Sequence, residues 1–138
     1  MKVLIDTCII IDALQNREPF CADAQAIFLL AANRRLTGFL SAKSVADIYY
    51  LTHKVTHSVK KTKQILRALF SLFELVDTTG SDCLQAITSD ISDFEDAVMV
   101  GSAVRANMDC IVTRNLKDYI ASPIPVYGPK DFLAQMEA

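Results

Sequence analysis

The stretch K-V-L-I-D-T-C-I-I-I-D-A-L, residues 2–14, joins a short apolar run to Asp6 and then to a second apolar run. Residues 2–5 predict a buried strand that ends at Asp6, and we expect a helix over residues 8–15. A short apolar strand of this kind is typical of a parallel sheet that helices cover on both faces. The opening of the chain therefore predicts an α/β fold with an aspartate at the end of its first strand.

The same order of strand and helix repeats along the rest of the chain. Further strands are expected at residues 36–41, 74–78, 110–113 and 125–127. Apolar residues at helical spacing predict helices between them, at 21–35, from Ser44 onward, 58–73, 81–89, 93–107 and 130–136. This alternation predicts a three-layer α/β/α domain around a central, mainly parallel sheet of four to five strands.

The composition suits one folded domain over residues 1–138. Of the 138 residues, 51% are hydrophobic and 22% are charged, which excludes a disordered or collagen-like chain. No apolar run approaches the roughly 18 residues of a membrane helix, and we expect no signal peptide and a cytoplasmic location. The four cysteines have no C-x-x-C spacing and are expected to be reduced, with Cys8 and Cys110 in the core.

Several acidic residues fall where a strand ends or a helix begins. Asp6 follows the first strand, Asp47 and Asp96 lie near the starts of two helices, and Asn115 and Asp118 follow the fourth strand. In a parallel sheet such positions meet at one edge, where ligands bind. Carboxylates brought together repel one another unless a cation neutralises them, and oxygen ligands without His or Cys suit Mg²⁺ or Mn²⁺. Such ions activate a water and stabilise charge during phosphodiester hydrolysis.

Each acid also has a purely structural interpretation. Ser44 and Asp47 match the S-x-x-D pattern of a helix cap, and Ser92 and Glu95 match a second pattern, S-x-x-E. Asp118 fits a polar surface turn. Taken singly these acids are explained by structure, whereas their combination indicates a metal site.

The charges are unevenly distributed along the chain. Residues 24–73 contain eight basic residues and one acid, whereas residues 74–96 contain seven acids and no base. The basic segment 54–67 could hold the backbone of a nucleic acid, and ordinary solvated helix faces are the alternative. Four aromatic residues are interpreted as core or dimer contacts rather than as base-stacking platforms: Tyr49, Tyr50, Phe70 and Phe73.

Four motifs in order resemble those of the PIN-domain family, of the kind found as VapC-type toxic ribonucleases in bacterial toxin–antitoxin pairs. They are V-L-I-D-T-C-I-I-I-D-A-L (3–14), S-A-K-S-V-A-D-I (41–48), D-F-E-D-A-V (93–98) and I-V-T-R-N-L-K-D-Y (111–119). The resemblance implies a PIN-like α/β/α fold and an endoribonuclease that hydrolyses RNA with Mg²⁺ or Mn²⁺. It also implies an antitoxin partner whose tail blocks the acidic edge, and a homodimer.

The resemblance places Asp6, Asp47, Asp96 and Asn115 at the family's acidic positions. We expect the metal ligands and catalytic residues to be Asp6, Asp47, Asp96 and Asp118, with Asn115 as a further catalytic residue. Two of these positions depart from the family's pattern. The second acid is usually Glu, and Asp47 is one methylene shorter; the residue after Thr-Arg is usually acidic, and here it is Asn115. We expect Asn115 to orient a ligand or a water and Asp118 to supply the missing carboxylate.

Two alternatives stay open. The chain could be a catalytically weak or inactive PIN-like module that binds RNA or protein and has lost turnover through the changes at Asp47 and Asn115. It could instead be a phosphoryl-transfer domain on a similar sheet, although Asp6-Thr7-Cys8 lacks the second Asp of the phosphatase pattern D-x-D. No phosphate-binding glycine loop occurs in the sequence, which excludes the common nucleotide-binding motifs.

Overall fold

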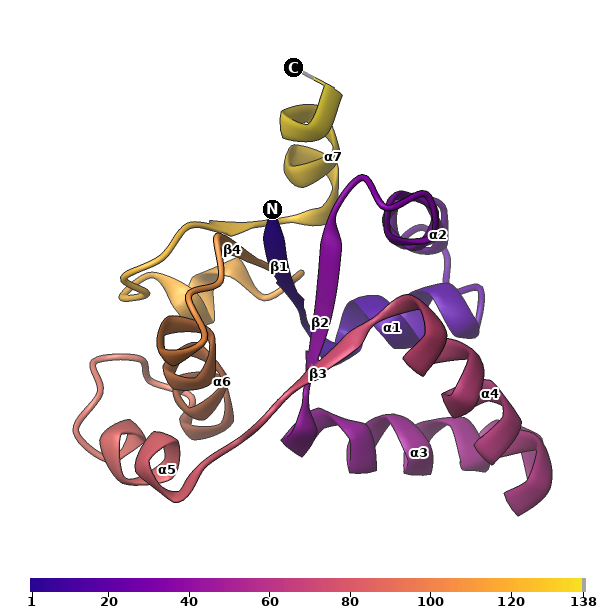
Figure 1. Cartoon of the computed structure of the whole chain (residues 1–138), viewed down its shortest axis with the longest axis horizontal. Coiled ribbons are helices and arrows are strands. Elements are labelled where there is room, and N and C mark those ends of the chain that lie inside the picture. The colour runs from indigo at the N-terminus through magenta and orange to yellow at the C-terminus, as the bar shows by residue number, and fades with distance from the viewer. Residues whose placement is uncertain (138) are drawn as a thin grey trace.

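Five parallel strands form the central sheet of the computed structural model, which describes residues 1–137 (Figure 1). The strands are β1 (Lys2–Ile5), β2 (Thr37–Ser41), β3 (Glu74–Val76), β4 (Cys110–Val112) and β5 (Val126–Tyr127). Their order across the sheet is β3-β2-β1-β4-β5, and each neighbouring pair is parallel. The predicted α/β fold with a mainly parallel sheet of four to five strands is confirmed.

Helices cover both faces of this sheet. They are α1 (Thr7–Leu14), α2 (Cys21–Ala32), α3 (Ala42–Thr56), α4 (Val59–Leu72), α5 (Gly80–Ala86), α6 (Phe94–Arg105) and α7 (Pro129–Glu137), with a 3-10 helix, η1, at Leu116–Tyr119. Helices α5 and α6 pack on one face, whereas α1, α2, α3, α4 and α7 pack on the other (Figure 1). Among residues 1–137, no helix combines the length and the hydropathy that crossing a membrane requires.

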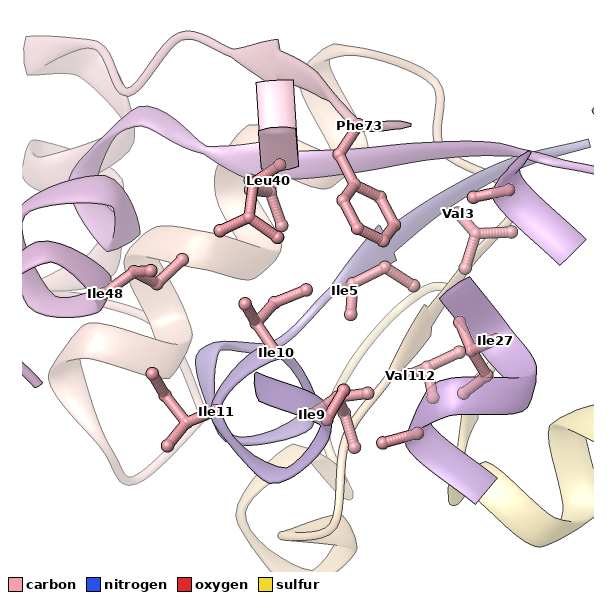
Figure 2. Close-up of a cluster of buried hydrophobic side chains, with 14 of the residues drawn as sticks. Val3, Ile5, Ile9, Ile10, Ile11, Ile27, Leu40, Ile48, Phe73 and Val112 are labelled. Carbon is pink, nitrogen blue, oxygen red and sulfur yellow. The ribbon is translucent and has the colours of Figure 1, made fainter. Parts of the chain in front are cut away.

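The alternation of side chains along β1 explains the two cores. Val3 and Ile5 point into the larger cluster, and Figure 2 shows Ile5 beside the isoleucines of α1 and Val3 on the side of Ile27 of α2. Leu4 points to the opposite face and packs with residues of α6. All three side chains are fully buried, as expected for a strand in the middle of a sheet. The central position of β1 places the residue that follows it, Asp6, at the middle of the sheet edge.

Two predicted helix starts are wrong. Ser41, and not Ser44, is the N-cap of α3: its hydroxyl accepts a hydrogen bond from the Ser44 backbone amide at 3.3 Å. Asp93, and not Ser92, is the N-cap of α6, and its carboxylate accepts a hydrogen bond from the Asp96 backbone amide at 2.9 Å. Each helix therefore has a cap that leaves the side chains of Asp47 and Asp96 free for other contacts.

Candidate active site

One pocket at the carboxyl edge of the sheet collects every site residue that the sequence predicts. It has a volume of about 580 Å³ and is lined by Asp6, Asp47, Asp96, Asn115 and Asp118. Two further acids, Asp93 and Glu95, and three basic residues, Arg17, Lys43 and Lys54, complete its charged lining. Six carboxylates thus border a single pocket, together with three cations.

Asp6 lies at the centre of this edge because β1 and β4 are neighbours. Its backbone amide donates to the Val112 carbonyl at 3.0 Å, which continues the β1–β4 ladder by one residue and places Asp6 beside Thr113. One carboxylate oxygen, Oδ2, accepts a hydrogen bond from the buried Thr113 hydroxyl at 2.7 Å. The other, Oδ1, accepts from the Thr7 amide at 2.7 Å and caps α1. Only 9% of Asp6 is exposed, so its carboxylate is held in one orientation.

Asp96 reaches the pocket from the first turn of α6. Its Oδ1 accepts a hydrogen bond from the buried Tyr119 hydroxyl at 2.9 Å, across to η1. Burial raises the pKa of Asp96 to about 6, and the negative charges of Asp93, Asp6 and Asp118 act in the same direction, against the effect of the Tyr119 hydrogen bond. The raised pKa reflects in part repulsion among the carboxylates, which a bound cation would relieve.

After β4, Asn115 directly precedes η1, and Asp118 lies within it. The Asn115 backbone amide donates to the Thr113 hydroxyl at 3.0 Å, and Thr113 in turn donates to Asp6. The Asp118 amide donates to the Asn115 carbonyl at 3.0 Å, which fixes the first turn of η1. The turn therefore brings an amide and a carboxylate to the pocket, as the spacing of the motif predicts.

Asp47 lies in the second turn of α3, one turn later than predicted, and its contacts differ from those of Asp6. Lys43 pairs with Asp47 at 3.7 Å and with Glu95 at 3.3 Å, so its ammonium bridges α3 and α6. The Asp47 side chain is 54% exposed. Lys43 therefore neutralises part of the negative charge on this side of the pocket.

The donor set fits a hard divalent cation. The pocket offers carboxylate and amide oxygens, and neither histidine of the chain lines it. Burial and the charge of Asp6 raise the pKa of Cys8 to about 11, so the thiol of this pocket residue is neutral at pH 7 in the metal-free protein. Within residues 1–137, no three acidic, His or Cys side chains converge closely enough to hold an ion as they stand. Binding would therefore require the more exposed carboxylates, such as Asp47 and Asp118, to turn toward Asp6 and Asp96.

Arg114, in the middle of the T-R-N motif, points away from the acidic pocket. It donates two hydrogen bonds to Asp12 of α1, at 2.6 and 3.2 Å, and Asp12 is fully buried. Its guanidinium also lies 4.0 Å from the centre of the Phe20 ring. This ion pair joins the segment after β4 to α1, the two segments that flank Asp6.

Three side-chain expectations need correction or addition. Cys8 is only partly buried: it packs against the larger core cluster and also lines the pocket, whereas Cys110 and Phe73 are buried as predicted. Tyr50 is 66% exposed and lines the pocket, so it is not a core residue. Tyr119 was not among the predicted site residues. Its contact with Asp96 joins residues 23 positions apart, and no local pattern reveals such a contact.

With this geometry established, similarity to known proteins identifies the family. Residues 2–117 match the family model of the PIN domain. The chain belongs to the PIN domain family. A comparison with curated protein sequences gives no match.

Several solved structures contain a chain with the same fold. A chain of VapBC2 from Rickettsia felis bound to promoter DNA superposes with a TM-score of 0.68 at 19% identity, covering 93% of this chain and 98% of that one. A toxin–antitoxin complex from Klebsiella pneumoniae gives 0.68 at 20% identity, with 92% and 97% covered. FitAcB from Neisseria gonorrhoeae gives 0.67 at 19% identity, with 93% and 98% covered. The shared fold therefore extends over nearly the full length of each matched chain.

Proposed function

We propose that this PIN-domain chain is an endoribonuclease that hydrolyses RNA phosphodiester bonds with Mg²⁺ or Mn²⁺. The observation that carries the proposal is the pocket at the carboxyl edge of the sheet, where six carboxylates and Asn115 surround an opening of about 580 Å³. Hydrolysis of a phosphodiester needs little covalent chemistry from the protein and depends on positioning and on neutralising charge.

Asp6 and Asp96 are the principal metal ligands in this proposal. Both are held by a hydroxyl donor, from Thr113 and Tyr119 respectively, which orients the carboxylate toward the pocket. Asp47 and Asp118 would complete the ligand set, and Asn115 would orient a ligand or a water. When bound, the ion supplies positive charge that favours deprotonation of the attacking water and offsets the charge that develops on the phosphodiester.

The biological role proposed is that of the toxin in a toxin–antitoxin pair. Proteins of the same fold have been solved in toxin–antitoxin complexes, including the one from Klebsiella pneumoniae. The expected partners are RNA as substrate, an antitoxin protein and a second copy of the chain. Expression of the chain alone should arrest growth, co-expression with a protein encoded beside it should restore growth, and light scattering of the purified chain should report a dimer.

Cleavage of RNA tests the proposed site directly. The wild-type chain should cleave single-stranded RNA in Mg²⁺ or Mn²⁺ but not in EDTA, and Asp6→Asn should abolish cleavage. Retained metal-dependent cleavage by Asp6→Asn would exclude this site. Asp90→Asn is the matched control because Asp90 is exposed and lies outside the pocket.

A binding module without turnover is the second candidate. Two observations favour it: within residues 1–137 no three acidic, His or Cys side chains lie close enough together to hold an ion as they stand, and Lys43 already pairs with two of the pocket acids. RNA or protein binding without any metal-dependent cleavage would support this candidate over the nuclease.

A further inference from the structure

Helix α3 continues beyond the acids along one wall of the pocket. Asp47, Tyr50 and Lys54 are spaced i, i+3 and i+7, which places them on one face of the helix, and all three line the pocket. Arg17, in the turn after α1, lines the same pocket. Arg17 lies beside α3, because it donates to the Gln15 side-chain oxygen at 3.2 Å and the Gln15 amide donates to the Leu51 carbonyl at 3.1 Å. The pocket therefore extends from Asp6 along α3 to a part that carries an aromatic ring and two cations.

The ring of Tyr50 is exposed to solvent, and the neighbouring ring of Tyr49 packs against it. It is 66% exposed, and within residues 1–137 its hydroxyl makes no hydrogen bond to the protein. Tyr49 meets it edge to face, with ring centres 5.2 Å apart, and Tyr49 is itself stacked against His53 at 6.0 Å. This packing limits the motion of the Tyr50 ring while leaving an aromatic surface exposed.

Lys54 and Arg17 differ from the third cation of the pocket. Lys43 pairs with two carboxylates, whereas neither Lys54 nor Arg17 has an acidic partner within 4 Å among residues 1–137. Both are exposed. Two unpaired cations beside an exposed ring match the composition of sites that bind single-stranded nucleic acid, where bases stack on aromatic rings and cations hold the backbone.

We propose that Tyr50, Lys54 and Arg17 form a subsite for a single-stranded stretch of RNA next to the cleaved phosphodiester. Tyr50 stacks on an unpaired base, while Lys54 and Arg17 bind phosphates. Lys54 lies about 10 Å from Asp47 along the helix axis, so the subsite takes a nucleotide that neighbours the one at the carboxylates. This inference rests on the proposed function for its substrate class. A duplex offers no free base face to Tyr50, so the subsite selects unpaired RNA.

The test measures binding separately from cleavage. Fluorescence anisotropy with the purified full chain in EDTA gives the dissociation constant for a short oligoadenylate over a range of salt concentrations. Tyr50→Leu should weaken binding roughly 5- to 150-fold, while Tyr50→Phe should retain it. The salt dependence should be unchanged in Tyr50→Leu because no phosphate contact is lost. Phe70→Leu is the matched control, since Phe70 is exposed on α4 and lies outside this pocket.

Lys54→Gln provides the complementary result. It should reduce the slope of log affinity against log salt by about 0.7, the value for one phosphate contact on a single strand. Arg34→Gln, an exposed charge change in the turn before β2 at the opposite edge of the sheet, should leave the slope unchanged. With 2-aminopurine in the oligonucleotide, wild-type binding should quench its fluorescence, and Tyr50→Leu should lose that quenching.

The outcomes distinguish this inference from the proposed function. If the wild type cleaves RNA but Tyr50→Leu binds the oligonucleotide as tightly as the wild type, the subsite is overturned and the nuclease stands; the Tyr50 surface then serves another ligand, such as a protein. If Tyr50→Leu weakens binding but the wild type never cleaves, the subsite stands and the nuclease fails. A wild type that does not bind single-stranded RNA overturns the subsite.

Discussion

Replacing Asp96 by Asn should stabilise the metal-free protein at neutral pH, at the expense of its metal site. Asp96 is half-buried among other carboxylates, and its ionised form is repelled by Asp93, Asp6 and Asp118. The asparagine side chain would keep an oxygen to accept the Tyr119 hydrogen bond and would remove the charge. Asp96 thus lowers the stability of the metal-free protein, yet a buried hydroxyl holds its carboxylate in place. Both properties are expected of a residue that binds a cation.

The size and pH dependence of this effect follow from the raised pKa. Burial, with the neighbouring charges, raises the pKa of Asp96 from its ordinary value of 3.8 to about 6. At 1.36 kcal/mol per pKa unit this difference corresponds to about 3 kcal/mol, which screening by solvent reduces to about 1–2 kcal/mol. The folded state holds the proton more tightly than the unfolded state, so stability falls as pH rises from about 4 to about 6. Above about pH 6 the full cost is present, and below about pH 4 it disappears.

Urea unfolding followed by circular dichroism measures the effect. In EDTA at pH 7, Asp96→Asn should be about 1–2 kcal/mol more stable than the wild type, and the two should agree at pH 4. Asp90→Asn, which removes an exposed acid outside the pocket, should change neither value. Added Mn²⁺ should stabilise the wild type and not Asp96→Asn. The prediction is wrong if the difference in free energy of unfolding between Asp96→Asn and the wild type is the same at pH 7 as at pH 4.

Three further substitutions test the supports of the site. Thr113→Val removes the hydroxyl that donates to Asp6, and its Mn²⁺ affinity, measured by calorimetry, should fall about 10- to 100-fold. Thr113→Ser keeps a hydroxyl and should keep the affinity, so equal affinity in both variants would show that the hydrogen bond does not support metal binding. Tyr119→Phe removes the donor to Asp96 and should weaken Mn²⁺ binding by about 10-fold with an unchanged far-ultraviolet spectrum; unaltered binding would show that the hydrogen bond has no part in it. Arg114→Met leaves a fully buried carboxylate without its partner and should cost about 3–5 kcal/mol in urea unfolding, so a loss below about 1 kcal/mol would argue against the buried pair.

The fold was predictable because its strands are apolar runs that end in polar residues. The run at residues 2–5 is covered on both faces, and Asp6 directly follows it, so one short segment indicated both a central strand and its acidic end. The parallel arrangement then required Asp6 and the residues after β4 to share an edge. The positions of the predicted site residues in one pocket follow from this topology more than from any single motif.

What the sequence could not predict depends on tertiary contacts. Ser41 and Ser44 are both good N-cap residues three positions apart, and the end of β2 at Ser41 decides between them. Tyr49 and Tyr50 differ by only about 100° around α3, yet one packs on the core and the other faces the pocket. The Tyr119 contact depends on how η1 packs against α6, which no local pattern encodes.

Calorimetric titration with Mn²⁺ determines whether the carboxylates at the edge of the sheet form a metal site. The titration compares the wild type with the double variant Asp6→Asn/Asp96→Asn. Each asparagine retains a side-chain oxygen that can accept the hydrogen bond from the Thr113 or the Tyr119 hydroxyl. We expect binding by the wild type and none by the double variant. Equal binding by both proteins, or no binding by the wild type, would contradict the claim.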